Sequence, residues 1–250
     1  MRQYTSVFML YARSTFWKIF GLPLGLGAVQ AGLFWWRLGA GAELDPETFE
    51  LTLEEVLEMS RIHWVFGVLV VLTVVLLGRV GGGNADYTFR RLSVPYWTVI
   101  GIQALYNSLC LLMLWMAEAL LVLGLCRYGL NVMGVESHQA LFLACYRGDF
   151  LHNLVPMADV GRWVRNITFV LSVGFTTACA PAMNRKSKMG FLEVDVLLVF
   201  AVMFCTNPMG ETSGDVAWIV GFAVMVFIAL ARLSAAKEDE EGSDEREETV

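Results

Sequence analysis

Six uninterrupted apolar stretches, each with charged residues near its edges, divide this chain. A membrane-crossing helix needs about 20 apolar residues, whereas apolar residues of a soluble domain recur at the helix or strand period. Hydrophobic residues make up 56% of the 250 residues and charged residues 17%, against about 25% charged residues in soluble domains. We therefore predict an all-α integral membrane protein with six transmembrane helices: Phe20–Trp36, His63–Leu77, Tyr96–Cys126, Ile167–Met183, Val194–Cys205 and Val216–Ala231.

The positions of lysine and arginine set the expected orientation. A cytoplasmic N-terminus places twelve of the 18 basic residues, including every lysine, on the inner side and the remaining six outside. Basic residues favour the cytoplasmic side, so we predict that both ends of the chain lie inside.

Two further features exclude other classes of protein. The net charge of −6 argues against a nucleic-acid binder, and the first residues carry no pattern of a cleavable signal peptide.

The two ends of the chain differ from the spans in composition. Residues 1–19 mix aromatic and apolar residues with Arg2, Arg13 and Lys18, which is typical of an amphipathic helix in the inner interface. The alternative is that they begin a long first span. Residues 20–236 then form the six-helix domain. Residues 237–250 hold eight acidic residues in fourteen, which predicts a disordered cytoplasmic tail.

Two outer segments are long enough to have structure of their own. Glu43–Arg61 is acidic and contains a capping-box pattern at Thr52; it is either a solvated helix or an attractant for a cationic substrate. Residues 138–155, in which the stretch Ala140–His152 mixes apolar and polar side chains, form either an interfacial helix or a partial re-entry into the membrane. The glycosylation triplet that begins at Asn166 abuts the fourth span.

Signals for catalysis are scarce. The three histidines are separated and lack the spacing of metal ligands, so we expect no metal site. Asp149 and His152 form an i, i+3 pair, which we interpret as an interfacial hydrogen bond rather than an acid–base pair. The five cysteines lie mostly in apolar stretches and favour small hydrophobic fillers, although Cys126 and Cys145 could meet outside.

One acid stands out inside a span. Glu118 lies in the outer half of the third stretch, and burying such a charge is costly without a partner. The fourth span begins from the outside at Arg162 and Arg165. The sequence therefore suggests a Glu118–Arg165 pair that lines a polar path or locks the two helices together.

The basic segment between the second and third stretches carries a family resemblance. It reads Tyr87-Thr88-Phe89-Arg90-Arg91-Leu92-Ser93-Val94-Pro95 and follows the glycine turn Gly81–Asn84. Together with the six spans, the inner ends and the N-terminal interfacial segment, it resembles the permease subunit of an ATP-binding-cassette exporter of the second (ABC-2) type. The segment after the fifth stretch, Asn207–Asp215, is shorter than the re-entrant hairpin that many relatives carry there.

The resemblance implies ATP-driven export of a peptide, an antibiotic or a lipid across the bacterial cytoplasmic membrane. A separately encoded ATPase would bind ATP and Mg²⁺, two permease chains would assemble as a homo- or heterodimer, and this chain would hold no cofactor and no catalytic residue. The ATPase would dock on Phe89, Arg90, Arg91 and Leu92. The alternatives that remain open are a membrane assembly or immunity factor, a channel or facilitator, and an intramembrane enzyme.

Overall fold

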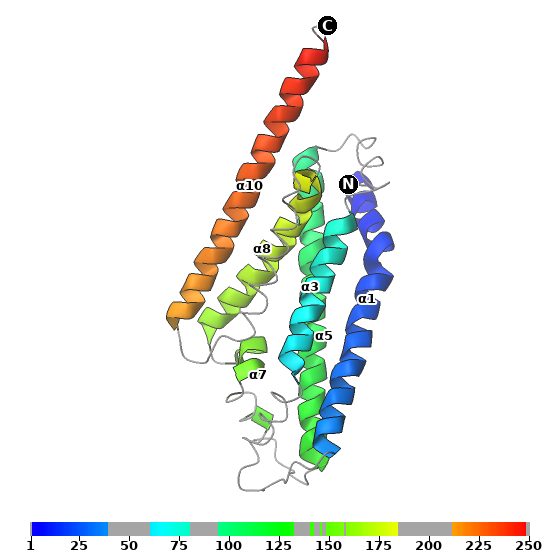
Figure 1. The fold of residues 1–250 in the computed structure, drawn as a ribbon, viewed down its shortest axis with the longest axis vertical. Helices are drawn as coiled ribbons and strands as arrows, with labels where there is room; N and C mark the ends of the chain where they lie inside the picture. Colours follow the sequence, from blue (N-terminus) through cyan, green and yellow to red (C-terminus); the bar gives the residue numbers. More distant parts are fainter. Residues whose placement is uncertain are drawn as a thin grey trace.

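The part of the chain that the structure describes is helical throughout. The computed structural model describes residues 2–39, 61–80, 95–132, 141–142, 146, 149–157, 159–184 and 212–248, and within them it contains no strand. The helices are α1 (Arg2–Gly39), α3 (Ile62–Val80), α5 (Tyr96–Val132), α7 (Asp149–Leu154), α8 (Val160–Asn184) and α10 (Thr212–Glu248) (Figure 1). The predicted all-α class is confirmed for these residues.

Three of the described helices are long and apolar enough to cross a membrane. They are Phe8–Gly39 in α1, Trp97–Val132 in α5 and Thr212–Ala235 in α10, while α3 holds a shorter apolar stretch, Ile62–Gly78. The fourth predicted span lies within α8, and the fifth, Val194–Cys205, lies outside the described residues. The length and composition of these helices fit a membrane protein.

Helix α8 reverses the pattern that a soluble helix shows. Its buried face carries Arg162, Arg165, Asn166, Ser172, Thr176 and Thr177, while large apolar side chains on the other face are exposed, among them Val160, Ile167 and Leu171. In water this arrangement would expose apolar surface and bury polar groups at a cost. In lipid the same arrangement is favourable, because inward polar groups can pair with each other.

Helix α5 is the centre of the bundle. Helices α1, α3, α7 and α8 pack on it, and α10 packs on α8, so that α10 forms the flank of the molecule opposite α1 (Figure 1). The largest buried cluster joins these helices and includes Phe66, Leu114, Trp115, Phe169 and Phe222. Both chain termini lie toward the same end of the bundle (Figure 1).

Helices α8 and α10 run parallel to each other. Phe169 of α8 contacts Phe222 of α10, with ring centroids 5.4 Å apart. Further along both helices, Cys179 lies in one buried cluster with Leu233. The last residue of α8 and the first residue of α10 therefore lie at opposite ends of this helix pair.

The first helix differs from its prediction. The sequence suggests an interfacial helix that ends before the first span, but α1 is continuous from Arg2 to Gly39 and contains Pro23. Its early residues pack against α5: the Tyr11 hydroxyl donates to Gln103 Oε1 at 3.0 Å, and the hydroxyls of Thr15 and Tyr106 lie 2.6 Å apart. These contacts hold Tyr11 and Thr15 against α5, and no break separates them from the rest of the helix.

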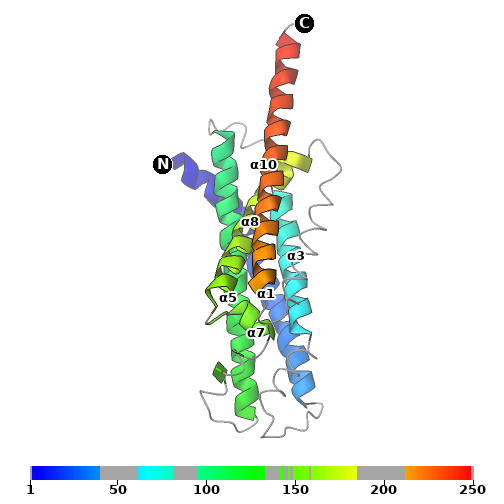
Figure 2. The same ribbon diagram turned by 90° about the vertical axis from the view of Figure 1, so that its left-hand side faces the viewer.

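The C-terminal tail also differs from its prediction. The sequence suggests disorder over residues 237–250, whereas α10 continues to Glu248. Glutamate, lysine and arginine have high helix propensity and make up eight of the twelve residues 237–248, so this acidic segment can extend a helix already formed by the apolar residues before it. This extension projects beyond the other helices in both views (Figures 1 and 2).

Candidate functional site

A buried group of charges joins the start of α8 to the start of α10. Arg165 Nη1 donates to Asp215 Oδ1 at 2.6 Å, and both side chains are almost fully buried. Arg162 Nε lies 3.8 Å from Asp215 Oδ2 and 3.5 Å from Asp159 Oδ2. Two buried guanidinium groups therefore share the carboxylate of Asp215, and Asp159, at the edge of the cluster, balances the second positive charge.

The amide of Asn153 brings α7 into the same cluster. Its Oδ1 accepts hydrogen bonds from Arg162 Nη1 at 2.6 Å and from Arg165 Nη2 at 3.1 Å. Asn166 Nδ2 donates to the main-chain oxygen of Asn153 at 2.9 Å. Because Arg162, Arg165 and Asn166 all belong to the first two turns of α8, these bonds fasten the end of α7 to that helix.

The two acidic residues of the cluster lie at helix N-termini, where a negative charge is favourable. Asp159 precedes α8, and its Oδ1 accepts from the backbone N–H groups of Gly161 at 2.9 Å and Arg162 at 3.4 Å, which is the bonding of an N-cap. Asp215 lies in the first turn of α10, where the helix dipole favours a negative charge. Arg162 and Arg165 are three residues apart, and this spacing puts them on one face of α8.

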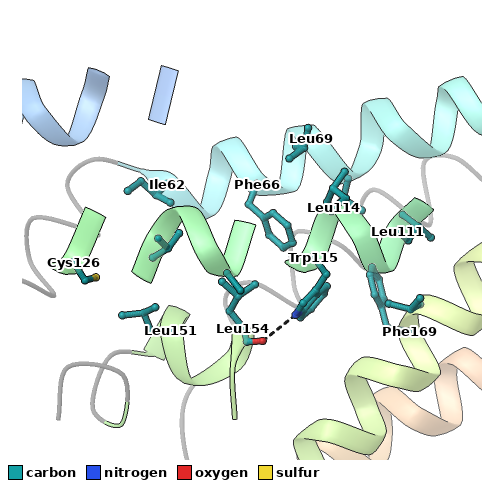
Figure 3. Close-up of a cluster of buried hydrophobic side chains, with 14 of the residues drawn as sticks. Ile62, Phe66, Leu69, Leu111, Leu114, Trp115, Cys126, Leu151, Leu154 and Phe169 are labelled. Carbon is teal, nitrogen blue, oxygen red and sulfur yellow. Dashed lines mark hydrogen bonds between the residues drawn. The ribbon is translucent and has the colours of Figure 1, made fainter. Parts of the chain in front are cut away.

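An aromatic series crosses the bundle beside the charges. The ring centroids of Phe66 and Trp115 are 5.6 Å apart, those of Trp115 and Phe169 6.2 Å, and those of Phe169 and Phe222 5.4 Å. The Trp115 indole N–H donates to the main-chain oxygen of Leu154 at 2.9 Å (Figure 3). Trp115 thus ties α7 to α5, as Asn153 ties it to α8.

Replacing Trp115 with phenylalanine tests this tie. The substitution keeps an aromatic ring among Phe66 and Phe169 but leaves the Leu154 oxygen without its side-chain donor, so we expect a loss of about 1–2 kcal/mol in unfolding free energy. The measurement is thermal unfolding of the detergent-purified protein. A control on the lipid-facing side is Trp163→Phe, since Trp163 is exposed, and it is expected to leave the unfolding temperature unchanged. Equal effects of the two substitutions would contradict the assigned hydrogen bond.

Glu118 has a different partner from the one that the sequence suggests. It is buried, and Gln30 Nε2 of α1 donates to its Oε1 at 2.7 Å. The same nitrogen lies 3.3 Å from the main-chain oxygen of Ile62, the first residue of α3. The structure does not bring Glu118 and Arg165 together as a pair: Glu118 joins α5 to α1 and α3, whereas Arg165 joins α8 to α10.

Of the other residues named in the sequence analysis, some lie outside the described part of the chain and others are buried. The proposed docking residues Phe89, Arg90, Arg91 and Leu92 lie outside the described residues, as does the acidic segment before Arg61. Asn166 is 4% exposed and hydrogen-bonded, so its side chain cannot accept a glycan in this fold. His152 is buried with its ring against Tyr146.

The described cysteines lie in apolar surroundings, as the sequence predicts. Cys110, Cys126 and Cys179 are buried among apolar residues, as small hydrophobic fillers would be. Within the described ranges, no group of three His, Cys, Asp or Glu side chains is placed to hold a metal ion.

Two residues of the site escaped prediction from the sequence. Asp215 directly precedes an apolar stretch and reads as a loop residue, and Gln30 is an uncharged residue within the first span. The available signal for Asp215 was the two arginines at the start of the fourth span, because two buried cations require an anion nearby. No comparable signal marks Gln30.

Comparisons of the chain with protein-family models, with curated proteins and with solved structures find no match. Buried guanidinium and carboxylate groups, hydrogen-bonded through one asparagine, can hold three helical segments in a fixed arrangement.

Proposed function

We propose that this protein is the transmembrane permease subunit of an ATP-driven exporter of the ABC-2 type. In this proposal a separately encoded ATPase supplies the energy, and two permease chains form the route for a peptide, an antibiotic or a lipid. Apolar helices long enough to cross a membrane and the inward polar face of α8 support a multi-pass protein.

The packing around the start of α1 is the observation that carries the proposal. Leu77 near the end of α3 and Tyr11 near the start of α1 lie in one buried cluster, against which Val99 near the start of α5 packs. The chain between α3 and α5 contains Arg90 and Arg91, and it connects two helix ends that lie beside the start of α1. This end of the bundle also holds both termini (Figure 1), so a single surface there would offer the basic segment to a cytoplasmic ATPase.

The parallel arrangement of α8 and α10 supports the six-span topology. The chain from Asn184 to Thr212 joins opposite ends of this helix pair, and α8 is 25 residues long, or about 37 Å at 1.5 Å per residue. A crossing at Val194–Cys205 is the simplest way to cover that distance through lipid, because a membrane-spanning backbone must satisfy its own hydrogen bonds. With that crossing, both ends of the chain lie on one side, as the distribution of basic residues predicts.

Purification of the complex tests the proposal. A tagged chain extracted from its native membrane should carry a stoichiometric ATP-binding-cassette ATPase, identified by mass spectrometry. The double reversal Arg90→Glu/Arg91→Glu should lower the bound ATPase by more than about tenfold, because reversed charges at an interface repel the partner. The matched control is Arg127→Glu, an exposed arginine near the other end of α5, and it should retain the ATPase.

Two results would count against the proposal. If the double reversal binds as much ATPase as the parent chain, the docking assignment is wrong. If no ATPase accompanies the intact chain, the chain functions instead as an assembly or immunity factor, or as a channel.

A further inference from the structure

We propose that Arg162 and Arg165 form a binding site for an external phosphate or carboxylate group, and that Asp215 occupies this site as an internal ligand. An anionic molecule that reaches the site competes with Asp215 and releases the first turn of α10 from α8. This inference is independent of the exporter assignment, since it concerns contacts within one chain and involves no partner protein.

The two guanidinium groups converge on a single carboxylate. Arg165 Nη1 donates to Asp215 Oδ1 at 2.6 Å, and Arg162 Nε lies 3.8 Å from Oδ2 of the same carboxylate. The two arginines are 1% and 0% exposed. A guanidinium group binds carboxylate and phosphate oxygens well because it offers several N–H donors in one plane. The carboxylate of Asp215 therefore marks the position where an external anion would bind.

Residues of α7 and α8 hold the arginines in place without help from α10. Asn153 Oδ1 accepts from both guanidinium groups, at 2.6 Å and 3.1 Å. Asn166 Oδ1 accepts from Arg165 Nε at 3.4 Å and from Nη2 at 3.3 Å. Within the described residues, Asp215 is the member of this cluster that α10 contributes. The guanidinium groups thus keep their supporting hydrogen bonds when Asp215 leaves.

The charge of the site favours phosphate over a second carboxylate. Asp215 is the buried acid of the cluster, whereas the side chain of Asp159 is 43% exposed. A buried cation without a matching anion is costly. A phosphate monoester carries about two negative charges near neutral pH, so one such group can neutralise both arginines. We therefore expect a phosphate monoester to bind more tightly than a carboxylate.

Asp215 lies where α10 can open without leaving the bundle. It is the fourth residue of the helix, and helix ends fray readily. The next residue, Val216, is 54% exposed. Two turns further on, Phe222 holds α10 against Phe169 of α8, with ring centroids 5.4 Å apart. Opening of the first turn alone therefore uncovers the arginines while the rest of α10 stays packed.

Binding of the anion makes this opening favourable. Departure of Asp215 by itself would leave the arginines without their buried anion, which is strongly unfavourable. An external anion restores the missing charge, and a ligand shifts an equilibrium between two states by its difference in affinity for them. The first turn of α10 consequently opens when an anion takes the place of Asp215.

Stabilisation of charge-deleted variants by added anions tests the binding site. Asp215→Asn keeps a side-chain oxygen that can accept from Arg165 but removes the charge, and Asp215→Ala removes both. Each variant is unfolded thermally in phosphatidylcholine nanodiscs with potassium phosphate, with potassium acetate, with phosphatidic acid in the bilayer, or with potassium chloride at equal ionic strength. At about 100 times Kd, the phosphate group should raise the unfolding temperature by about 5–10 °C relative to chloride. Acetate should raise it less, and the parent chain should respond less than either variant.

The control for this experiment is the triple variant Arg162→Met/Arg165→Met/Asp215→Leu, which lacks both guanidinium groups and should not respond to any anion. A rise with phosphatidic acid alone identifies a lipid headgroup as the ligand, whereas a rise with free phosphate as well identifies any accessible phosphate group. If Asp215→Ala unfolds during purification, phosphate added at extraction should increase the recovery of monodisperse protein. No gain in either variant, or an equal gain in the triple variant, would overturn the proposal.

A distance measurement tests the exchange in a chain that retains Asp215. Spin labels are attached at Val164→Cys of α8 and Val216→Cys of α10, both exposed positions, after alanine has replaced the native cysteines. Addition of phosphatidic acid or phosphate should lengthen this distance. Labels at Leu171→Cys and Val224→Cys, further along the same helices, should keep their separation. An unchanged distance for the first pair would show that the anion does not displace Asp215 and would refute the exchange.

Discussion

Replacing Asp215 with alanine is expected to destabilise the folded protein by about 3–5 kcal/mol, because it leaves buried positive charges without their anion. Arg165 Nη1 would lose its 2.6 Å bond to the carboxylate, and Arg162 would lose a charge 3.8 Å away. Since a folded protein is stable by only about 5–15 kcal/mol, we expect a large fall in unfolding temperature and a loss of monodisperse protein on size-exclusion chromatography.

Two further variants test whether the unbalanced buried charge causes the loss of stability expected for Asp215→Ala. Asp159→Asn removes the other carboxylate near Arg162, but the Asp159 side chain is 43% exposed and asparagine also caps a helix well; its expected cost is about 0–1 kcal/mol. The apolar combination Arg162→Met/Arg165→Met/Asp215→Leu removes all three buried charges together. It should recover most of the stability lost in Asp215→Ala, since a buried ion pair can be replaced by apolar groups at little cost. A triple variant no more stable than Asp215→Ala would show that hydrogen bonds to Asn153 matter more than the charges.

Replacing Gly174 with alanine is expected to separate α5 from α8 at a cost of about 1–3 kcal/mol. A Cβ at this position would overlap the Ser108 side chain and would lie 2.9 Å from the Ser108 nitrogen and 3.1 Å from its Cα. A side chain can rotate away, but backbone atoms can move only if the helix moves. The close approach also places the Gly174 oxygen 3.4 Å from Asn107 Nδ2, so the same shift weakens that hydrogen bond.

The control for Gly174 lies on the facing helix. Gly101 of α5 has open space where a Cβ would be added, and alanine is the better helix former by about 1 kcal/mol. Gly101→Ala should therefore be neutral or stabilising in thermal unfolding. The double variant Ser108→Ala/Gly174→Ala should remain destabilised because the backbone overlap persists; full recovery would show that the Ser108 hydroxyl alone limits the approach.

Much of the helical architecture could be predicted from apolar length. Each predicted span within the described residues lies in a helix, since about 20 apolar residues in lipid have to satisfy their backbone groups within the segment. The structure of the N-terminal and C-terminal segments was harder to predict from the sequence. Residues 11–19 join α1 because Tyr11 and Thr15 find partners on α5, and the acidic tail continues α10 because helix propensity can extend an existing helix.

The sequence marked Glu118 and Arg165 as residues to examine, but it did not indicate their partners. Arg165 and Glu118 stand out because charges near or within membrane spans are rare and costly. Their partners, Asp215 and Gln30, lie 50 and 88 residues away in the chain. Sequence separation does not indicate which of several polar residues a helix will face. The sequence therefore suggested Glu118 and Arg165 as a pair, because both lie toward the outer side of their predicted spans.

What the sequence determined by itself is the class of the chain and the cost that its charges impose. Continuous blocks of apolar residues predict membrane-spanning helices. A charged residue buried among them must have a polar partner. Only the tertiary structure decided which partner each charge has, because that choice depends on how α1, α3, α5, α8 and α10 are rotated and displaced against one another. Those rotations follow from packing, such as the close approach of Gly174 to Ser108, and packing is a property of all the helices together.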